Sequence, residues 1–303
     1  MSRKRRRKKI KMSRKNAEIL LAAVIIARST SYMFSKMVME TMGPFNLMGV
    51  RFTIAFAILA VIFHRKLLAL NKKTLQYGMI IGGIYFLTMT AELFGLKLTD
   101  TSTTSFLENT AIVLVPLIEA VICRKSPAAK ALFSAALTLT GVGFLAFRDG
   151  SISLKPGVIL CLLAAMLYAV GIILTDRLAR KEDPLTIGIL QVGFMGAFSV
   201  IASFIFETPR LPDSTMEWGS IIMLAVVCSC FGFTLQPVAQ KYTTSERTGM
   251  FCALNPLTAA TLGTLLLNES LGVQGLAGAA LVLGGILISS LKLSSKVEKV
   301  PAV

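Results

Sequence analysis

The sequence predicts an all-α membrane protein with about ten transmembrane helices, arranged as two inverted five-helix repeats. The first reason is composition: 54% of the 303 residues are hydrophobic and only 16% are charged, which is typical of membrane proteins. The second is spacing, because the apolar residues gather into stretches of about 18 to 22 residues, the length of helix that crosses roughly 30 Å of hydrocarbon. The third is an internal repeat.

The expected helices follow one another through loops too short to hold a soluble domain. The first comes after a basic segment, as in a signal peptide, yet its apolar run is longer than a signal peptide's and more spans follow, so we expect it to be retained. The expected spans are 17–37, 47–64, 75–96, 102–122, 128–147, 156–175, 185–206, 216–236, 247–267 and 273–292.

The repeat is visible without gaps: residues 241–287 lie over residues 97–143 at a constant offset of 144. Upstream the offset is 140, which places Arg28 over Tyr168. Five spans is an odd number, so the second copy must enter the membrane in the opposite orientation. The expected units are a basic N-terminal arm at 1–16, a first repeat at 17–150, a second repeat at 151–292 and a tail at 293–303.

The net charge of +16 is distributed by side of the membrane. Ten of the 32 Lys and Arg residues lie in the first fifteen positions, and with the N-terminus inside, 25 fall on the cytoplasmic side against four outside. This asymmetry predicts a multi-pass protein of the cell (inner or plasma) membrane with both termini cytoplasmic. It also favours contact of the N-terminal arm with anionic lipid head groups over binding of nucleic acid.

Several motifs resemble one family. Asn255 to Leu257, Leu265 to Leu271 and the glycine-rich stretch Gly275 to Gly285 are similar to the last two spans of the EamA-type permeases of the drug/metabolite transporter superfamily. The first half shows the pattern of these last two spans more loosely, as Val113 to Pro116 and Ala135 to Gly143. Met48 to Phe52 resembles the arginine-phenylalanine pair that opens the second span of those permeases.

Two positions depart from the family. Arg28-Ser29 stands where the family commonly has tryptophan-glycine in the first span, and Lys125 replaces a glutamate at the end of the fourth. The first departure lies deep in the membrane and suggests a different substrate. The second lies at the cytoplasmic edge, where it strengthens the predicted topology.

The resemblance implies a secondary-active transporter of small organic metabolites, amino-acid-like or other polar solutes, moved outward by alternating access. The halves of an inverted repeat rock around a site near the midplane. No ATP-binding motif, cofactor motif or metal-ligand spacing occurs, and the catalytic clusters that an intramembrane enzyme needs are absent, so we expect neither a cofactor nor an enzyme. The alternatives are a lipid-phosphate flippase and a non-transporting membrane scaffold. A monomer and a homodimer are both compatible with ten spans.

Arg28 is the deepest ionisable residue, eleven positions into the first span. A charge at that depth is costly, which favours a functional role. One reading is a guanidinium that binds a substrate carboxylate or phosphate. The other is an internal ion pair with Glu108 or Glu92.

Glu92 and Glu108 lie in the third and fourth spans and are candidates for proton coupling. A buried carboxyl group can take up a proton on one side of a membrane and release it on the other. The alternative is neutralisation by Arg51 or Lys36. Arg51 could also close an outer gate by pairing with a carboxylate. At the offset of 144, Glu92 and Glu108 correspond to Gln236 and Cys252, which confines charge to the first half.

Polar residues at membrane depth complete the expected substrate site, either as hydrogen-bonding groups for a ligand or as contacts between helices. They are Tyr32, Asn109, Tyr168, Gln191, Gln236 and Asn255.

Three prolines fall inside expected spans, where each lacks a backbone donor and bends the helix. They either unwind the helix at a substrate site or bend it to fit its neighbours. These expected kinks are at Pro116, Pro237 and Pro256.

Overall fold

The computed structural model is helical apart from two two-residue strands, β1 (Phe147–Arg148) and β2 (Ser151–Ile152), which pair antiparallel. It describes residues 12–122, 124, 126, 129–148, 151–152, 155–243, 248, 251–252, 254–266 and 272–290. The helices are α1 (Arg14–Val38), α2 (Pro44–Ile62), α3 (His64–Leu67), α4 (Lys72–Leu98), α5 (Thr101–Glu108), α6 (Ala111–Ile122), α7 (Ala129–Ala146), α8 (Pro156–Ala179), α9 (Pro184–Phe206), α10 (Thr215–Met223), the π-helix η1 (Leu224–Phe233), α11 (Thr234–Gln240), α13 (Leu254–Leu266) and α14 (Val273–Ser290).

Seven helical segments are long and apolar enough to cross a membrane. They are Arg14–Val38, Pro44–Ile62, Lys72–Leu98, Thr101–Ile122, Pro156–Ala179, Pro184–Phe206 and Thr215–Gln240. Shorter apolar stretches occur within α7 and α14. The prediction of spans is confirmed for these seven segments and stays a prediction for the other three. Most of the N-terminal arm, the tail, Lys125 and the 267–271 part of the family motif lie outside the described residues.

The expected fourth span, 102–122, agrees with the segment Thr101–Ile122 and consists of two helices, α5 and α6. The division lies at Asn109 and Thr110, because both side chains bind carbonyl groups of the preceding turn: Asn109 Nδ2 donates to Ser105 O at 2.7 Å and Thr110 Oγ1 to Leu107 O at 2.7 Å. Such bonds compete with the helical ladder. α6 continues through Pro116, which is therefore not the point of interruption.

The segment 215–240 contains ten residues of π-helix, η1, between α10 and α11. π-Helical turns are rare in proteins, and those that occur are frequently found at functional sites. η1 ends at Phe233, four residues before Pro237, whose missing amide cannot pair with the Phe233 carbonyl. The third proline, Pro256, lies in α13, two residues after Leu254.

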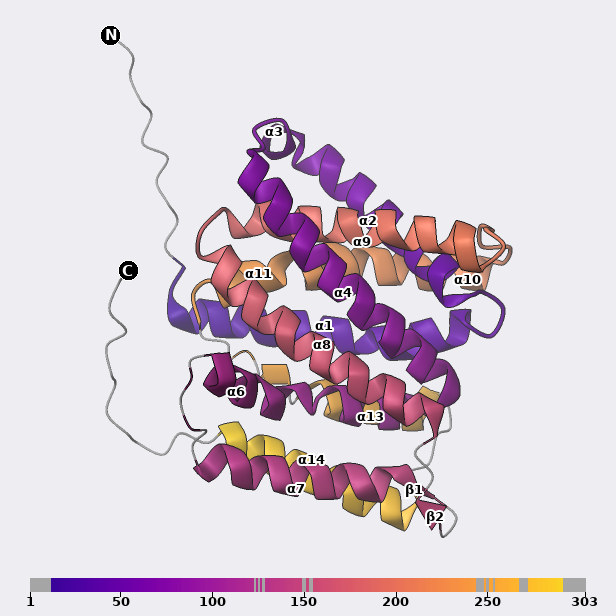
Figure 1. Ribbon diagram of the computed structural model, residues 1–303. Coiled ribbons are helices and arrows are strands. Elements are labelled where there is room, and N and C mark those ends of the chain that lie inside the picture. Colours follow the sequence, from indigo (N-terminus) through magenta and orange to yellow (C-terminus); the bar gives the residue numbers. More distant parts are fainter. Residues whose placement is uncertain are drawn as a thin grey trace.

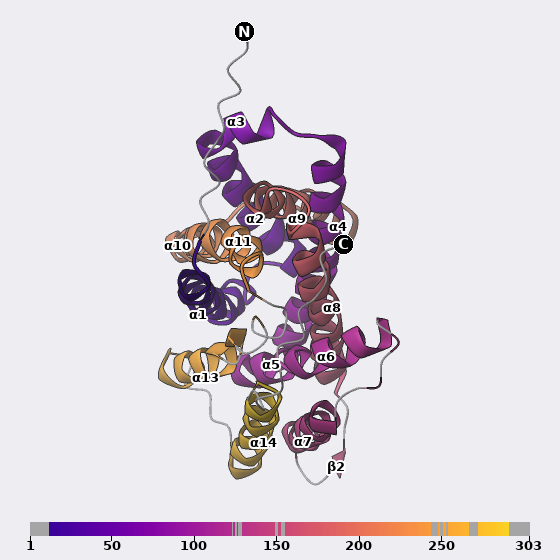
Figure 2. The same ribbon diagram turned by 90° about the vertical axis from the view of Figure 1, so that its left-hand side faces the viewer.

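The helices lie between two pairs at opposite sides of the bundle (Figures 1 and 2). α2 packs against α9 at one side, and α7 packs against α14 at the other. Between them α4 packs on α8 and α9, while α1 packs on η1 and α13. The two outer pairs, each formed by one helix from either half of the sequence, are called the α2–α9 seam and the α7–α14 seam below.

The α2–α9 seam is fastened at both ends by hydrogen bonds. Where α2 begins and α9 ends, the Glu207 carboxylate accepts the amides of Phe45 at 3.0 Å and Asn46 at 2.8 Å. Where α2 is followed by its loop and α9 begins, Lys66 Nζ lies 2.6 Å from Asp183 Oδ2. The middle of the seam is closely packed, since a Cβ atom at Gly196 would lie 3.2 Å from the α2 backbone.

Large apolar side chains cover the outside of the bundle, among them exposed Val61, Phe204 and Leu265. Polar and charged side chains are buried inside it, including Arg28, Arg51, Glu92 and Glu108. This distribution, apolar outside and polar within, fits a bundle that faces lipid and encloses a polar site.

Candidate substrate site

Arg28 stands at the centre of the buried polar residues. It projects from the middle of α1, and its Nη1 donates to Tyr168 Oη of α8 at 2.9 Å and to Gln236 Oε1 of α11. Gly232 of η1 makes room for this side chain, because a Cβ atom there would lie 2.6 Å from Arg28 Cγ. A residue of the first half is thus held by two residues of the second.

The other edge of the Arg28 guanidinium is unoccupied. Both of its hydrogen bonds to described residues use Nη1, which leaves the Nε and Nη2 donors without a partner there. Those two N–H groups point the same way and form the fork that binds a carboxylate or phosphate bidentately. The geometry therefore offers a ready anion-binding edge deep in the bundle.

Aromatic rings surround this guanidinium. Its Cζ lies 4.1 Å from the ring centroid of Phe233 and 5.2 Å from that of Tyr168. Tyr85 packs edge-on against both rings, and its hydroxyl accepts Gln236 Nε2 at 3.4 Å. Cation–π contacts stabilise a buried guanidinium without neutralising it, so the positive charge stays available to an anion.

Two carboxyl groups lie side by side near Arg28. Glu108, the last residue of α5, accepts the Tyr32 hydroxyl, and Glu92 of α4 is the immediate neighbour of Glu108. Glu108 is within electrostatic reach of Arg28. No ion pair links Arg28 to either glutamate in the described part of the chain, so the predicted alternative of an internal Arg28–glutamate pair is not found.

The second half contributes neutral groups at the positions equivalent to the acids. Cys252, the counterpart of Glu108, lies 3.6 Å from Tyr168 Oη, and Gln236, the counterpart of Glu92, holds Arg28. Asn109 and Asn255 come together at the edge of this group, 3.5 Å apart. The central polar cluster is defined here as Arg28, Tyr32, Tyr85, Glu92, Glu108, Tyr168, Gln236 and Cys252.

Arg51 and Gln191 are buried but lie apart from the hydrogen bonds of the central polar cluster. Arg51 donates through Nε to Ser229 Oγ at 2.8 Å and through Nη1 to Ser31 Oγ at 2.9 Å. The amide oxygen of Gln191 has no partner among the described residues. Arg51 is within electrostatic reach of Glu92, and neutralisation of Glu92 or Glu108 by Arg51 or Lys36 stays a prediction.

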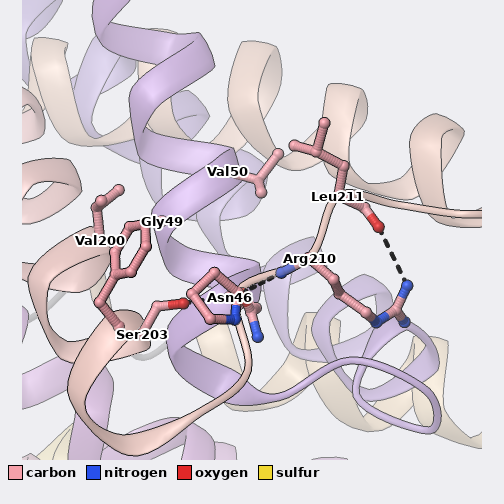
Figure 3. Close-up of a pocket in the computed structure, with 9 residues that line it drawn as sticks. Asn46, Gly49, Val50, Val200, Ser203, Arg210 and Leu211 are labelled. Carbon is pink, nitrogen blue, oxygen red and sulfur yellow. Dashed lines mark hydrogen bonds between the residues drawn. The ribbon is translucent and has the colours of Figure 1, made fainter.

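A pocket of about 260 Å³ lies elsewhere, at the end of the α2–α9 seam (Figure 3). Asn46 and Val50 of α2, Ser203 of α9, and Arg210 and Leu211 after α9 help line it. The dashed line from the Arg210 amide to Asn46 in Figure 3 is 3.1 Å long. The pocket shares no residue with the central polar cluster, and its walls are mostly apolar.

The sequence prediction missed three residues: Tyr85 of the central polar cluster, Ser229, which binds Arg51, and Phe233, which packs on Arg28 and Arg51. Tyr85 could have been found by the signal that identified Tyr168, a tyrosine at mid-span depth. Ser229 has a weak signal as a hydroxyl beside a cysteine in an apolar span. Phe233 has none, because its place beside two guanidinium groups depends on where η1 turns it.

Comparison with known proteins agrees with the geometry. The profile of the EamA-like transporter family matches residues 15–147 and 155–291. Membrane-length helices, a buried polar cluster and this match define a multi-pass membrane transporter. The chain belongs to the EamA-like transporter family, so the resemblance seen in the sequence is confirmed.

Relatives carry transporter names. An uncharacterized transporter of Archaeoglobus fulgidus is 25% identical over 277 residues, 91% of this chain and 86% of the relative. The uncharacterized transporter YcxC of Bacillus subtilis is 24% identical over 305 residues, 93% of this chain and 94% of the relative. A biotin transporter of Salmonella typhimurium is 25% identical over 171 residues, 54% and 56% of the two chains.

A solved crystal structure has a similar fold. It superimposes with a TM-score of 0.69 and covers 92% of this chain and 97% of its own, at 20% sequence identity. At that identity the likeness supports the fold alone.

Proposed function

We propose that the protein is a secondary-active transporter that moves small polar organic metabolites, amino-acid-like solutes among them, outward across the cell membrane by alternating access. The observation that supports this proposal most directly concerns the Arg28 guanidinium. It is buried between the halves, and no described residue binds its Nε–Nη2 edge. In this proposal Arg28 binds an acidic group of the solute. Tyr32, Tyr168, Gln236, Asn109 and Asn255 supply neutral hydrogen bonds around it.

The inverted repeat of ten helices is part of the proposal, and reciprocal contacts support it. In the α7–α14 seam, a Cβ atom at Gly141 would lie 2.7 Å from Gly278 O, and one at Gly285 would lie 2.8 Å from Ser134 O. At the sequence offset of 144, Gly141 corresponds to Gly285 and Ser134 to Gly278. Each contact is therefore the image of the other, as a two-fold axis between the halves requires.

Alternating access follows from where the cluster lies. Both hydrogen bonds of Arg28 to described residues cross from the first half to the second, so a rocking of one half against the other breaks and remakes the site's own contacts. A solute that bridges the halves can favour one arrangement over another, which is the differential binding that such a change needs.

Proton coupling is supported by the pairing of Glu92 with Glu108. Two negative charges side by side in a low-dielectric interior repel strongly, and uptake of a proton removes one of them. The proton held by this carboxyl pair and the acidic solute bound by Arg28 can then be exchanged across the membrane. Both termini on the cytoplasmic side, and an N-terminal arm on anionic head groups, complete the proposed arrangement.

The experiment is uptake into proteoliposomes from a pooled, mass-resolved metabolite mixture that includes biotin, with and without an imposed pH gradient. Wild type is compared with Arg28→Ala, and Arg14→Ala, an exposed arginine on the same helix, is the matched control. We expect selective accumulation by wild type and Arg14→Ala and its loss in Arg28→Ala. Accumulation that does not depend on Arg28 would refute the proposed site. Movement of labelled lipid instead of solutes would favour the flippase.

A further inference from the structure

Arg51 is a second buried cation that the proposed function leaves unexplained. It is fully buried on α2, and its two hydrogen-bond partners, the hydroxyl groups of Ser229 and Ser31, are neutral. Its third donor group, Nη2, has no partner in the described part of the protein. A buried charge with an unused donor, and with no ion-paired carboxylate among the described residues, is costly, and in a membrane span such a group usually serves a ligand.

The three groups around Arg51 come from both halves of the chain. Arg51 and Ser31 belong to the first half, on α2 and α1, and Ser229 belongs to the π-helix η1 of the second. Arg28, too, belongs to the first half and is bound by residues of the second. A ligand bound by Arg51 would therefore also touch elements that move against each other in alternating access.

Arg51 lies one aromatic ring away from Arg28. Both guanidinium groups lie over the Phe233 ring, Arg28 Cζ at 4.1 Å and Arg51 Cζ at 5.9 Å from its centroid. Neither forms an ion pair with a carboxylate of the described residues. Glu92 lies within electrostatic reach of both guanidinium groups.

We propose that Arg51, Ser31 and Ser229 form a second anion subsite, and that the transported solute carries two acidic groups, one held by Arg28 and one by Arg51. The inference rests on the transport function proposed above and narrows its substrate class. A carboxylate or phosphate oxygen fits both subsites, because guanidinium and hydroxyl groups are its preferred donors. The role predicted for Arg51 from the sequence, a gate closed by a protein carboxylate, stays a prediction, since Arg51 has no ion-paired carboxylate among the described residues.

The test measures binding separately from transport. Detergent-solubilised protein is titrated with succinate and glutarate, which have two carboxylates, and with butyrate and valerate, which have one. Thermal stabilisation reports the affinity. The variants are Arg51→Gln, Arg51→Lys and the surface control Arg14→Gln.

We expect wild type to bind the dicarboxylates at least about tenfold more tightly, the usual size of a charged hydrogen-bonded contact. Arg51→Gln should lose that preference and keep its monocarboxylate affinity. If that variant does not fold, Arg51→Lys carries the test, because it keeps the charge but not the fork and should lose most of the preference. Arg14→Gln should behave as wild type.

Equal binding of the two classes by wild type, binding of neither, or an equal loss of both in Arg51→Gln would overturn the subsite. Stabilisation by chloride or phosphate that needs Arg51, without any preference for dicarboxylates, would assign an inorganic anion to Arg51 and overturn the two-group solute. Dicarboxylate binding without flux in proteoliposomes would count against transport and leave the subsite standing.

Discussion

Residues at equivalent positions of the repeat meet in the central polar cluster, and they differ chemically. Arg28 and Tyr168 occupy the same place in the two copies and bond to each other at 2.9 Å. Two arginines there would place like charges in contact inside a low-dielectric interior, which is strongly unfavourable. At this pair of positions one half therefore carries the charge and the other a neutral hydrogen-bonding group.

A prediction at this scale concerns Glu108. Glu108→Gln keeps a group that can accept the Tyr32 hydroxyl but cannot exchange a proton. We expect it to abolish stimulation of uptake by a pH gradient while exchange of labelled for unlabelled solute continues. For one coupled proton, wild-type accumulation should change by about tenfold for each unit of imposed pH difference.

The measurement is labelled-solute uptake and counterflow in proteoliposomes, with the exposed Glu40→Gln as control. Stimulation that survives in Glu108→Gln would show that this carboxyl is not the coupling group, and the same assay on Glu92→Gln would then test its neighbour.

Most residues of the cluster were predictable because a polar group at membrane depth is conspicuous in an apolar span. Arg28, Glu92, Glu108, Tyr168 and Gln236 were all found in this way. Their mutual contacts were not, because the sequence does not show which helices face each other. The preference of Arg28 for Tyr168 and Gln236 over a glutamate depends on the packing of α1 against η1 and α11.

Among the elements, the two interrupted helices limited what the sequence could predict. Hydropathy averages over a window, so it located 102–122 and 216–236 as spans but could not detect the α5–α6 division or the π-helix η1. The division follows from the side-chain hydrogen bonds of Asn109 and Thr110, and η1 ends four residues before Pro237. The starts of helices are easier to predict from the sequence, because proline is favoured in the first turn. α2, α8 and α9 begin at Pro44, Pro156 and Pro184.

Glycine contacts give an element-scale prediction about stability. A Cβ atom at Gly188 of α9 would lie 2.3 Å from the Thr234 carbonyl oxygen of α11, whereas one at Gly219 of α10 would meet nothing within 4 Å. Gly188→Ala must therefore push backbone apart and should cost about 1–3 kcal/mol. Gly219→Ala should be neutral or stabilising by up to about 1 kcal/mol.

Thermal denaturation in detergent, followed by loss of the monodisperse chromatographic peak, compares the two variants with wild type. Equal midpoints for Gly188→Ala and Gly219→Ala would contradict the close approach of α9 and α11.

The start of α9 gives a prediction about pH. Partial burial opposes ionisation of Asp183, but bonds from Lys66 and Thr186 outweigh burial and lower its pKa. A pKa that is lower in the folded state stabilises the fold above the ordinary value of about 4, and the contribution is lost as pH falls through the lowered value. Asp183→Asn keeps the helix cap but loses the ion pair with Lys66.

We expect Asp183→Asn to be less stable near neutral pH by no more than about 1 kcal/mol, because the side chains of Lys66 and Asp183 are 37% and 48% exposed. The difference from wild type should shrink below about pH 4 and in high salt. Thermal midpoints measured over a pH series test this, and a difference that grows on acidification would contradict it.

Over the whole molecule, alternating access requires some contacts between the halves to persist and others to break. The α2–α9 seam is fastened at both ends and closely packed between. By contrast, α1 and η1 meet through polar contacts, among them that of Thr30 Oγ1 with Cys228 Sγ at 3.4 Å and the bonds of Arg51 to Ser31 and Ser229. We infer that the seam persists and that the α1–η1 contact changes during transport.

Crosslinking tests this division. In a background in which Cys228 is the sole native cysteine, Thr30→Cys should form a disulfide on oxidation and stop flux, and reduction should restore it. The matched control joins the seam through Gly49→Cys and Val200→Cys, with Cys228 also replaced, since a Cβ atom at Gly49 lies 3.3 Å from Val200. That disulfide should leave flux largely intact. Loss of flux in the control alone would reverse the assignment of moving and static contacts.

The contacts between the halves also bear on whether the two halves need to be joined in one polypeptide. The halves touch along α2–α9, α7–α14 and α4–α8, whereas the chain passes between them once, through the short β1 and β2 strands. Folding of the second half therefore needs the surface of the first more than it needs the peptide bond. We expect that a gene divided at that connection yields two fragments that assemble, when co-expressed, into a functional transporter. Two such separate chains are the arrangement from which a duplicated protein of this kind could have begun.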